Sequence, residues 1–596
     1  MWLTSLILSI CALVCLGAAA IAINHSDFIR SHRFNLFNAL FVCVFVSAII
    51  MFFPIHFSLE ESTVSGAWRA ILLSLFNSMQ IFAVGCEFGV VADGLLICPD
   101  SIDMIYQIWA ATLFVLAPIF TFGFVLSLFK NLTEYLRYLA SYFKDAYIFS
   151  ELNEKSIALA SDIKSKHKNV AIVFTDVFEE KDEVTSELID EAKKIRAICF
   201  KKDILVVNFK RHSSKKKIYF FTIGINENEN LNQSLKLIEE YKMCENVKLY
   251  AFSIKIESEI LLSSAQKGRM KVRRVNDVQS LINRVLYENG DIIFKSAREN
   301  SDGTKDISAV VIGMGHHGTE MVKALAWFCQ MDGYSLKITA FDKDPLAKEK
   351  FIALAPELMS DDYNGVKVKG EAEYTIDIHS GVDVETISFI EKIKKIFGAT
   401  YVLVALGNDD INISTAISLR MNFERMGIHP IIQAIVYNSQ QKCVLQDVKN
   451  FKGQKYDIDF IGDLDSSYSE NVIIDSELEG EALQRHLKWG EEEDFWNYEY
   501  NYRSSVASAI HMRARIACQI PGSEKKTEDL TDEERDAIEI LEHKRWNAYM
   551  RADGYVFSGS KNKESRNDLA KMHHDLVDFS SLSEDEKRKD SRVGAK

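Results

Sequence analysis

The sequence lacks the features that mark zinc proteins, disulfide-stabilised proteins and nucleic-acid-binding proteins. Its ten cysteines form no CxxC pair, so a metal framework is not expected. Most of them are scattered through apolar or soluble segments, which is typical of thiols in a reducing compartment. Positive charge is not in excess either, since the formal net charge is -14. Phosphate backbones bind concentrated basic surfaces, so nucleic acid is not an expected partner.

Catalytic arrangements are missing as well. No Ser/His/Asp set, carboxylate pair or His-x-Glu pattern stands out, so we predict no catalytic residue and do not expect an enzyme. Charge is scarce in residues 1–130, whereas the rest has the composition of a soluble protein. The length suggests three to four domains at about 150 residues each. The sequence therefore predicts a membrane α-helical region followed by α/β domains.

Three apolar stretches are long enough to cross a bilayer, whose hydrocarbon core takes about 20 helical residues. They cover residues 2–23, 34–53 and 105–128. A cleaved signal peptide is the alternative for the first stretch, but no basic residues precede it, which favours an uncleaved span. Residues 66–92 are ambiguous and form either a re-entrant hairpin or a fourth span.

Charges beside these stretches predict the orientation. Arg30 and Arg33 follow the first span, and further basic residues follow the last, whereas the intervening segments are acidic. The positive-inside rule then places the carboxyl-terminal part in the cytoplasm and favours three spans with a re-entrant segment. Cys86 and Cys98 fall in the outside segment, where a disulfide is an alternative to two free thiols.

A helix, the sequence Ala83-Val84-Gly85-Cys86-Glu87 and a final span follow one another in the order seen around potassium-channel pores. That filter reads TVGYG, and only Val84 and Gly85 agree with it, so potassium selectivity is not supported. Glu87 could form an acidic ring if subunits surround a pore for monovalent cations. The alternative is a plain helix with Gly85 at a packing contact.

Residues 140–290 alternate between apolar strands and helices, which predicts a parallel sheet. The expected strands are 145–152, 169–176, 217–224 and 246–254. The turn Ser150-Glu151-Leu152-Asn153 after the first strand lacks glycine, so we interpret this domain as Rossmann-like without dinucleotide binding.

Residues 305–470 carry the strongest motif. A strand, the turn Gly313-x-Gly315-x-x-Gly318 and a helix occur in succession, and the next strand ends in Asp342. Glycines in this pattern permit a tight turn, close phosphate approach and helix packing, while an acid about 20 residues on binds a ribose hydroxyl. A carboxylate repels a 2′-phosphate, so NAD(H) or another adenine nucleotide is favoured over NADP. A turn that binds nothing is the alternative.

The segments VIGMGHHG, AFDKD and VALGNDDIN together resemble the TrkA-N family, the RCK-type nucleotide-binding regulators of potassium transport. The resemblance covers roughly residues 305–440, and the preceding domain looks like a degenerate copy. It implies tandem Rossmann-like domains that bind nucleotide through the three glycines and Asp342, with Asn408 and Asp409 on the ligand side. It also implies a bacterial inner-membrane protein, multi-pass, that forms a homo-oligomer such as a tetramer.

Residues 471–534 are predicted to form a helical connector. Residues 535–596 contain the segments IEILEHKRWNAYMRADGYVFSG and KMHHDLVDFSSLSEDEKRKD, and through them this part of the chain resembles the mainly helical RyR module named after ryanodine receptors. His574 stands where that family commonly has proline. The resemblance, together with helical spacing, indicates a ligand pocket of aromatic and basic side chains. Its candidate residues are Glu542, His543, Trp546, Arg551 and Lys571. A core tryptophan with a structural polar pair is the alternative.

Three functions fit this organisation. The first is a ligand-gated ion channel or potassium-transport-like regulator that senses a nucleotide from the cytoplasm. The second is an antiphage-type effector that permeabilises the membrane when a nucleotide second messenger binds. The third is a membrane-tethered NAD-dependent oxidoreductase, which would need an acid–base group and a substrate pocket that the sequence does not indicate.

Overall fold

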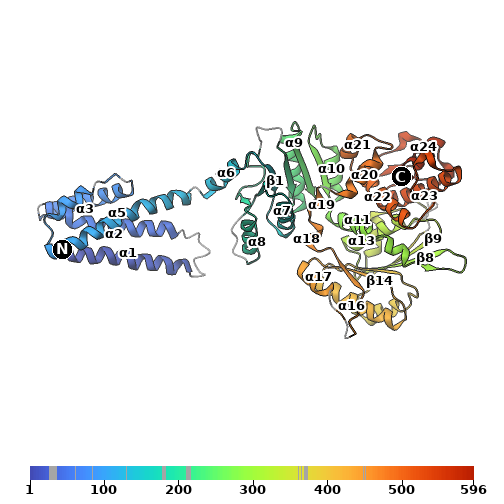
Figure 1. The fold of residues 1–596 in the computed structure, drawn as a ribbon, viewed down its shortest axis with the longest axis horizontal. Helices are drawn as coiled ribbons and strands as arrows, with labels where there is room; N and C mark the ends of the chain where they lie inside the picture. The colour runs from blue at the N-terminus through green and yellow to red at the C-terminus, as the bar shows by residue number, and fades with distance from the viewer. Residues whose placement is uncertain are drawn as a thin grey trace. The chain divides into compact units, whose positions relative to one another are not determined.

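The computed structural model describes residues 1–25, 36–60, 62–83, 85–86, 88–128, 130–177, 183–209, 216–359, 362–363, 366–367, 374–446, 449, 452–474 and 476–595. The chain divides into two compact units, one formed mainly by Met1–Ala140 and the other by Ser141–Val177 with Leu188–Lys596. The first unit is helical, and the second holds two parallel sheets covered by helices (Figure 1). The broad prediction of apolar helices followed by α/β structure is therefore confirmed.

The amino-terminal unit is built around α2, which packs against α1, α3 and α5. Within the described residues, two helical stretches are long and apolar enough to cross a membrane, Phe41–Leu59 and Asp100–Phe122, and a shorter apolar one covers Trp2–Ala18. The predicted spans 34–53 and 105–128 thus fall on longer helices. The helices are α1 (Trp2–His25), α2 (Leu36–Leu59), α3 (Val64–Phe82), α4 (Gly89–Leu95), α5 (Asp100–Leu128) and α6 (Lys130–Ala140).

Small polar side chains lie inside this helical unit, among buried apolar ones, and many large apolar side chains also lie on its outside. Ser9 and Ser47 share a hydrogen bond of 2.8 Å between their hydroxyl oxygens, and Trp109 Nε1 donates to Ser9 Oγ at 2.8 Å. Asn77 Nδ2 contacts His56 Nε2 at 2.8 Å. The exposed apolar side chains include Leu3, Ile7, Leu8, Trp68, Leu72, Phe76, Ile105, Ile108 and Phe122. Small polar residues between helices and leucines outside are the distribution expected of helices in lipid.

The segment after α2 turns back within the unit. The carbonyl of Phe82, at the end of α3, accepts a hydrogen bond of 3.1 Å from Thr121 Oγ1, well inside α5. Gly94 lies against Ile55 near the end of α2, since a Cβ there would stand 2.3 Å from the Ile55 side chain. The described residues between 64 and 99 therefore run along the bundle and come back towards the end of α2, and the choice between a re-entrant hairpin and a fourth span stays a prediction. Glu87, with Val84, lies outside the described residues, while Gly85 follows α3 with its N–H donating to Gln80 O at 2.9 Å.

The first sheet has the order β3-β2-β1-β4-β5-β6, and every neighbouring pair is parallel. Its strands are β1 (Asp145–Phe149), β2 (Val170–Phe174), β3 (Ile198–Cys199), β4 (Ile218–Thr222), β5 (Val247–Phe252) and β6 (Lys271–Val275). The helices are α7 (Glu154–Lys166), α8 (Glu183–Lys194), α9 (Glu227–Tyr241), α10 (Ile256–Ser264), α11 (Asp277–Asn289) and α12 (Asp291–Lys295). The four strands predicted here are confirmed as β1, β2, β4 and β5.

The second sheet repeats this topology in the order β12-β9-β8-β13-β14-β15, with β7 (Arg298–Glu299) antiparallel to β8. Counted along the chain, both sheets have the order 3-2-1-4-5-6, which is compatible with a Rossmann-like fold. The strands are β8 (Lys305–Ile312), β9 (Tyr334–Phe341), β12 (Tyr374–His379), β13 (Tyr401–Val404), β14 (Ile431–Ile435) and β15 (Ile458–Ile461), beside a hairpin of β10 (Asp362–Tyr363) and β11 (Val366–Lys367). The helices are α13 (His316–Phe328), α14 (Ala347–Leu354), α15 (Ile387–Ile393), α16 (Asp409–Arg425) and α17 (Ser439–Gln446).

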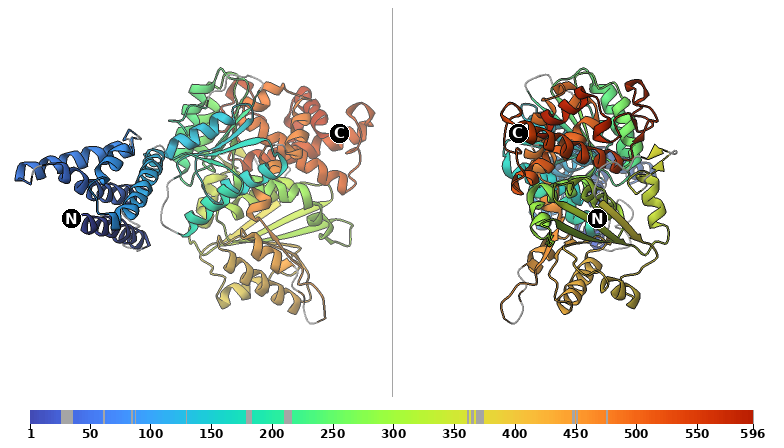
Figure 2. Two further views of the ribbon diagram at one scale, coloured as in Figure 1. Left: turned by 60° about the vertical axis from the view of Figure 1, so that its left-hand side comes forward. Right: turned by 90° about the vertical axis from the view of Figure 1, so that its right-hand side faces the viewer.

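The carboxyl-terminal helices share a hydrophobic core with the second sheet. Helix α13 packs against α23, and α11 packs against both α13 and α22 (Figure 2). The rings of Trp327 and Tyr549 meet edge to face at 6.0 Å across this contact. Residues predicted as a connector and a terminal module are thus parts of one core, and their sequence-based boundaries stay predictions. The helices are α18 (Leu464–Ser467), α19 (Glu470–Ile473), α20 (Glu477–His486), α21 (Glu492–Asn497), α22 (Glu499–Ala517), α23 (Asp532–Ala552) and α24 (Glu584–Gly594).

Short elements complete this part. They are the 3-10 turns η1 (Thr527–Asp529), η2 (Lys563–Ser565) and η3 (Phe579–Ser581), and the strands β16 (Val556–Phe557) and β17 (Met572–His573), which pair in parallel.

Candidate functional site

The glycine turn connects β8 to α13 and is held by close backbone contacts at its first and last glycine. Gly313 has φ +93°, and a Cβ on it would stand 2.4 Å from the carbonyl oxygen of Ala405. A Cβ on Gly318 would stand 1.7 Å from the carbonyl oxygen of Gly313. No other residue type fits either position without moving the backbone. These two glycines therefore have the structural roles that the motif predicts.

Gly315, in contrast, borders free space. It is exposed, and a Cβ on it would meet no atom within 4 Å. It is the N-cap of the 13-residue helix α13 and receives no side-chain cap, so the first N–H groups of the helix are left for another acceptor. An anion would be stabilised there by these N–H groups and by the helix dipole.

Asp342 lies directly beside this turn, as predicted. Its carboxylate accepts hydrogen bonds from the backbone N–H of Met314 at 2.5 Å and of Asp344 at 2.6 Å. A carboxylate has about four acceptor positions, so two remain for ribose hydroxyls. Asp342 thus connects the end of β9 to the glycine turn. Its remaining acceptor positions lie at the same edge of the sheet.

Asn408 and Asp409 follow β13 and lie at this carboxyl edge as well, but both hold the backbone. The Asn408 side chain caps α16 by accepting from Ile411 N at 3.1 Å. Asp409 accepts from the N–H of Tyr437 at 3.0 Å and of Asn438 at 2.9 Å, just after β14. Their observed contacts position the loops of β13 and β14 around the turn.

His317 lies in the phosphate turn of the motif, which suggests a contact with a ligand, but its side chain contacts another part of the protein. Its ring contacts the hydroxyl of Tyr437 at 3.2 Å, and burial, together with the charge of His316, lowers its pKa to about 4. Nearby, Asp277 at the start of α11 accepts from Lys155 Nζ at 2.7 Å and from the Tyr468 hydroxyl at 2.5 Å. This cluster joins the glycine-turn helix to α7 of the first sheet, a link that sequence spacing did not indicate.

The corresponding turn of the first sheet is occupied by side chains. Glu151 accepts from the N–H of Ile225 at 3.1 Å, and a Cβ on Gly224 would stand 2.6 Å from its carboxylate. Asn153 caps α7 by accepting from Ser156 N at 2.9 Å. A carboxylate and a cap fill the place where phosphate would bind, which agrees with the absence of glycine there.

A separate cavity of about 320 Å³ lies among α20, α22, α23 and the segment after them. Three of the five candidate residues of the terminal module line it, namely Glu542, His543 and Trp546. Arg551 instead faces Glu357, with 3.8 Å between Nε and the carboxylate. Lys571 instead donates to the carbonyl of Asp553 at 2.6 Å. The structure therefore divides the predicted pocket into residues that line the cavity and residues that hold the module.

Arginines that the sequence did not single out stand at this cavity. Arg485, Arg545 and Arg566 belong to its wall. The only sequence signal for this region is a stripe on α22, where Ser504, Ser508, His511 and Arg515 follow one another at helical spacing of four, three and four residues.

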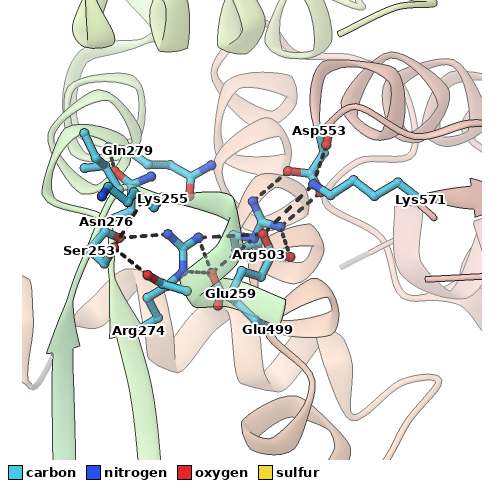
Figure 3. A network of polar contacts seen from close by, with 12 residues as sticks. Ser253, Lys255, Glu259, Arg274, Asn276, Gln279, Glu499, Arg503, Asp553 and Lys571 are labelled. Carbon is cyan, nitrogen blue, oxygen red and sulfur yellow. Dashed lines mark hydrogen bonds and ion pairs between the residues drawn. The ribbon is translucent and has the colours of Figure 1, made fainter. Parts of the chain in front are cut away.

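A buried polar network joins the first sheet to the carboxyl-terminal helices (Figure 3). Arg503 on α22 binds both carboxylate oxygens of Asp553, at 2.6 and 3.0 Å, and Glu259 of α10 at 2.6 Å. Arg274 on β6 donates to Glu499 at 2.7 Å. The network fixes the relative position of β6, α10 and α22 within the α/β unit.

His511 makes the stability of this unit sensitive to acid. Its Nε2 donates to the carbonyl of Gln330 at 2.7 Å, and burial, followed by the charges of Arg515, Arg545 and Arg485, holds its pKa well below 6.5. The unfolded chain then binds one more proton than the folded chain as pH falls below about 6.5, so the folded state loses stability there.

We expect His511→Asn to remove this dependence. Between pH 6.5 and 4.5 the free energy of unfolding of the wild type should fall further than that of the variant, by up to about 2 kcal/mol. Urea unfolding of both proteins at several pH values measures the difference. Parallel pH profiles would show that His511 is already protonated in the folded protein.

A comparison with protein-family models finds no match for this chain, and a comparison with curated proteins finds none either. The resemblances to TrkA-N and RyR domains therefore stay predictions, supported by motif residues alone.

Proposed function

We propose that the protein is a nucleotide-sensing membrane protein that binds NAD(H) or another adenine nucleotide at the Gly313–Gly318 turn. The observation that carries the proposal is the free space at Gly315 together with the uncapped start of α13, at the carboxyl edge of a parallel sheet. Ligands of open α/β sheets bind at this edge, where the strand order reverses. Here the reversal falls between β8 and β13, the two strands whose following loops meet at Gly313 and Ala405.

The membrane part of the proposal rests on the helical unit. Two of its helical stretches have the length and apolarity of membrane spans, and its small polar side chains are buried between helices while large apolar ones face outward. A ligand can shift such a protein only by its difference in affinity for two conformations, typically 1–3 kcal/mol per site. We propose that nucleotide binding controls a conductance of this helical unit, as the resemblance to RCK-type regulators implies.

Gly315→Asp tests the nucleotide site. The new carboxylate would enter the phosphate position and repel an anion, while a side chain is sterically allowed there. For the full chain in lipid nanodiscs, NAD at a hundredfold excess over Kd should stabilise the wild type by about 2.7 kcal/mol in thermal unfolding. The variant should show no shift with NAD, NADH, ATP or ADP-ribose. Gly480→Asp is the matched control, since Gly480 is an exposed glycine of α20 whose Cβ would also meet no atom.

The same variants separate binding from conductance. Proteoliposomes loaded with potassium or sodium should release the ion when NAD is added to the wild type and to Gly480→Asp, and not to Gly315→Asp. A full thermal shift in Gly315→Asp would contradict the site. Ligand binding without any ion flux would support the nucleotide site but would contradict the proposal that the nucleotide controls a conductance.

A further inference from the structure

The cavity beside α22 and α23 has a wall that is unusually rich in buried positive charge. Arg485 and Arg545 line it, and Arg515 lies next to it on α22; their exposed fractions are 8%, 1% and 1%. Arg545 donates to Glu542 at 2.6 Å, while Arg515 approaches the same carboxylate only to 3.9 Å. Glu542 is also the carboxylate that acts most strongly on Arg485. Two of these guanidinium groups, Arg545 and Arg515, thus stand around the single carboxylate of Glu542, and Arg485 lies near both Glu542 and Glu481.

Repulsion between these guanidinium groups adds to the effect of burial and lowers the pKa values of Arg515 and Arg485. Burial lowers the pKa of Arg515 to about 10, and the neighbouring Arg485 and Arg545 act in the same direction. Burial and Arg545 likewise lower the pKa of Arg485 to about 10. Buried charge that is only partly compensated is costly, and a second anion near Arg545 and Arg515 would relieve that cost.

Hydrogen-bonding groups around the cavity also lack partners. Arg545 Nη1, Arg515 Nη2, Ser508 Oγ and His574 Nδ1 are buried and make no hydrogen bond. Buried polar atoms in folded proteins are nearly always paired, so several orphans in one place indicate a missing molecule. Three of the four are capable donors to an anion, two of them guanidinium nitrogens.

Aromatic rings form another part of the wall. The rings of Trp546 and His573 meet edge to face at 4.9 Å, and Trp489 and Tyr500 line the same cavity. Such faces bind planar rings by stacking. The volume of about 320 Å³ is at the lower end of the range of small-molecule sites.

We infer that this cavity is a second ligand site, separate from the glycine turn, that binds a small anion with an aromatic ring, of the size and chemistry of a nucleoside monophosphate. The anionic group compensates the buried charge of Arg545 and Arg515, and the ring stacks on the Trp546 and His573 side of the wall. Lys563, Lys589 and Glu586 also line the cavity but are paired with one another, Lys563 Nζ and Lys589 Nζ standing 2.9 and 2.8 Å from the Glu586 carboxylate.

Calorimetric titration of the full chain in detergent with AMP tests this inference. The titration is done in the Gly315→Asp variant, so that the glycine turn cannot contribute. Arg545→Gln and Arg566→Gln should each weaken AMP binding by roughly tenfold or more, because a charge-assisted hydrogen bond is lost. Arg566 is the safer position, since its side chain is 35% exposed and its ion pair with Asp568 lies outside the wall. Arg535→Gln is the control, because Arg535 is an exposed residue on α23, the helix of Arg545. This variant should leave the affinity unchanged.

The adenosine and phosphate groups of AMP test the aromatic part and the basic part of the site separately. Trp546→Leu should weaken the binding of AMP and of adenosine but not of inorganic phosphate. Absence of AMP binding would overturn the inference. Binding that EDTA abolishes would overturn it too and would point to a metal ion at His573, His574 and Asp575, whose ligand atoms lie within 4.8 Å of one another.

Discussion

The substitution Arg503→Met is expected to destabilise the α/β unit by about 3–5 kcal/mol, the range found when one partner of a buried ion pair is removed. Three acidic side chains surround the Arg503 guanidinium: Asp553 and Glu259 at 2.6 Å each, and Glu499 at 3.6 Å (Figure 3). Arg503, Glu259 and Glu499 are each at most 14% exposed. Methionine fills a similar volume but leaves these carboxylates without their central cation.

The pKa of Asp553 also indicates that removing Arg503 destabilises the folded protein. Although burial opposes it, the charge of Arg503, with help from Lys571, lowers the pKa of Asp553 to about 2. A lowered carboxyl pKa contributes stability above the unfolded value near 4, and this contribution is lost as pH falls towards 2. In Arg503→Met most of that contribution should disappear at neutral pH.

Urea unfolding of the full chain in detergent measures this effect. Arg269→Met is the matched control, because Arg269 pairs with Glu245 at 2.9 Å with both side chains more than half exposed. Exposed pairs contribute about 0–1 kcal/mol, so the control should unfold close to the wild type. Equal midpoints for Arg503→Met and Arg269→Met would show that water or protons already neutralise the buried acids.

Gly318→Ala is expected to destabilise the protein by about 3 kcal/mol or more, although alanine is the better helix former. Gly318 lies in the first turn of α13, where propensity alone predicts a gain of about 1 kcal/mol. A Cβ at this position would stand 1.7 Å from the carbonyl oxygen of Gly313, which is backbone and cannot rotate away. The helix would have to move from the sheet, with the cost of overpacking.

Gly315→Ala is the control, because the same change three residues earlier meets no atom and is expected to alter stability by less than about 1 kcal/mol. Thermal unfolding of both variants without ligand decides the sign. An unchanged or raised melting temperature in Gly318→Ala would show that α13 does not pack closely on the turn. The nucleotide site would then lack the rigid frame on which its proposal rests.

The central strands of both sheets could be predicted from the sequence, and the edge strands could not. Buried parallel strands have continuous apolar sequences, as IYFFT in β4 does. Strand β6 reads KVRRV, and its buried Arg274 looks like a surface residue until Glu499, more than 200 positions later, is seen beside it. Strand β12 is the exception among the edge strands, because its strict alternation of apolar and polar residues is the pattern of a half-buried strand. Strand β3 has only two residues and therefore no distinctive pattern.

The glycine turn was predictable because its residues are close in sequence and each has a local role. The cavity was predictable only in part. Glu542, His543 and Trp546 share one helix, whereas the arginines around Glu542 come from α20, α22 and α23 and meet only in the folded protein. Arg551 and Lys571 were assigned to the pocket from the RyR resemblance, but their partners, Glu357 and Asp553, lie on other segments of the chain. Ion pairs between different elements determine where these side chains lie, and such pairs cannot be predicted from residue spacing along one helix.

The packing of α23 on α13 limits how this protein can change by recombination. The terminal sixty residues look like a cassette in the sequence, yet Tyr549 meets Trp327 on the back of the helix that begins at the glycine turn. A homologous exchange of that cassette would leave the apolar face of α13 without a matching partner unless α13 changed with it. We therefore expect the two segments to be inherited together, so that substitutions on one side are accompanied by substitutions on the other.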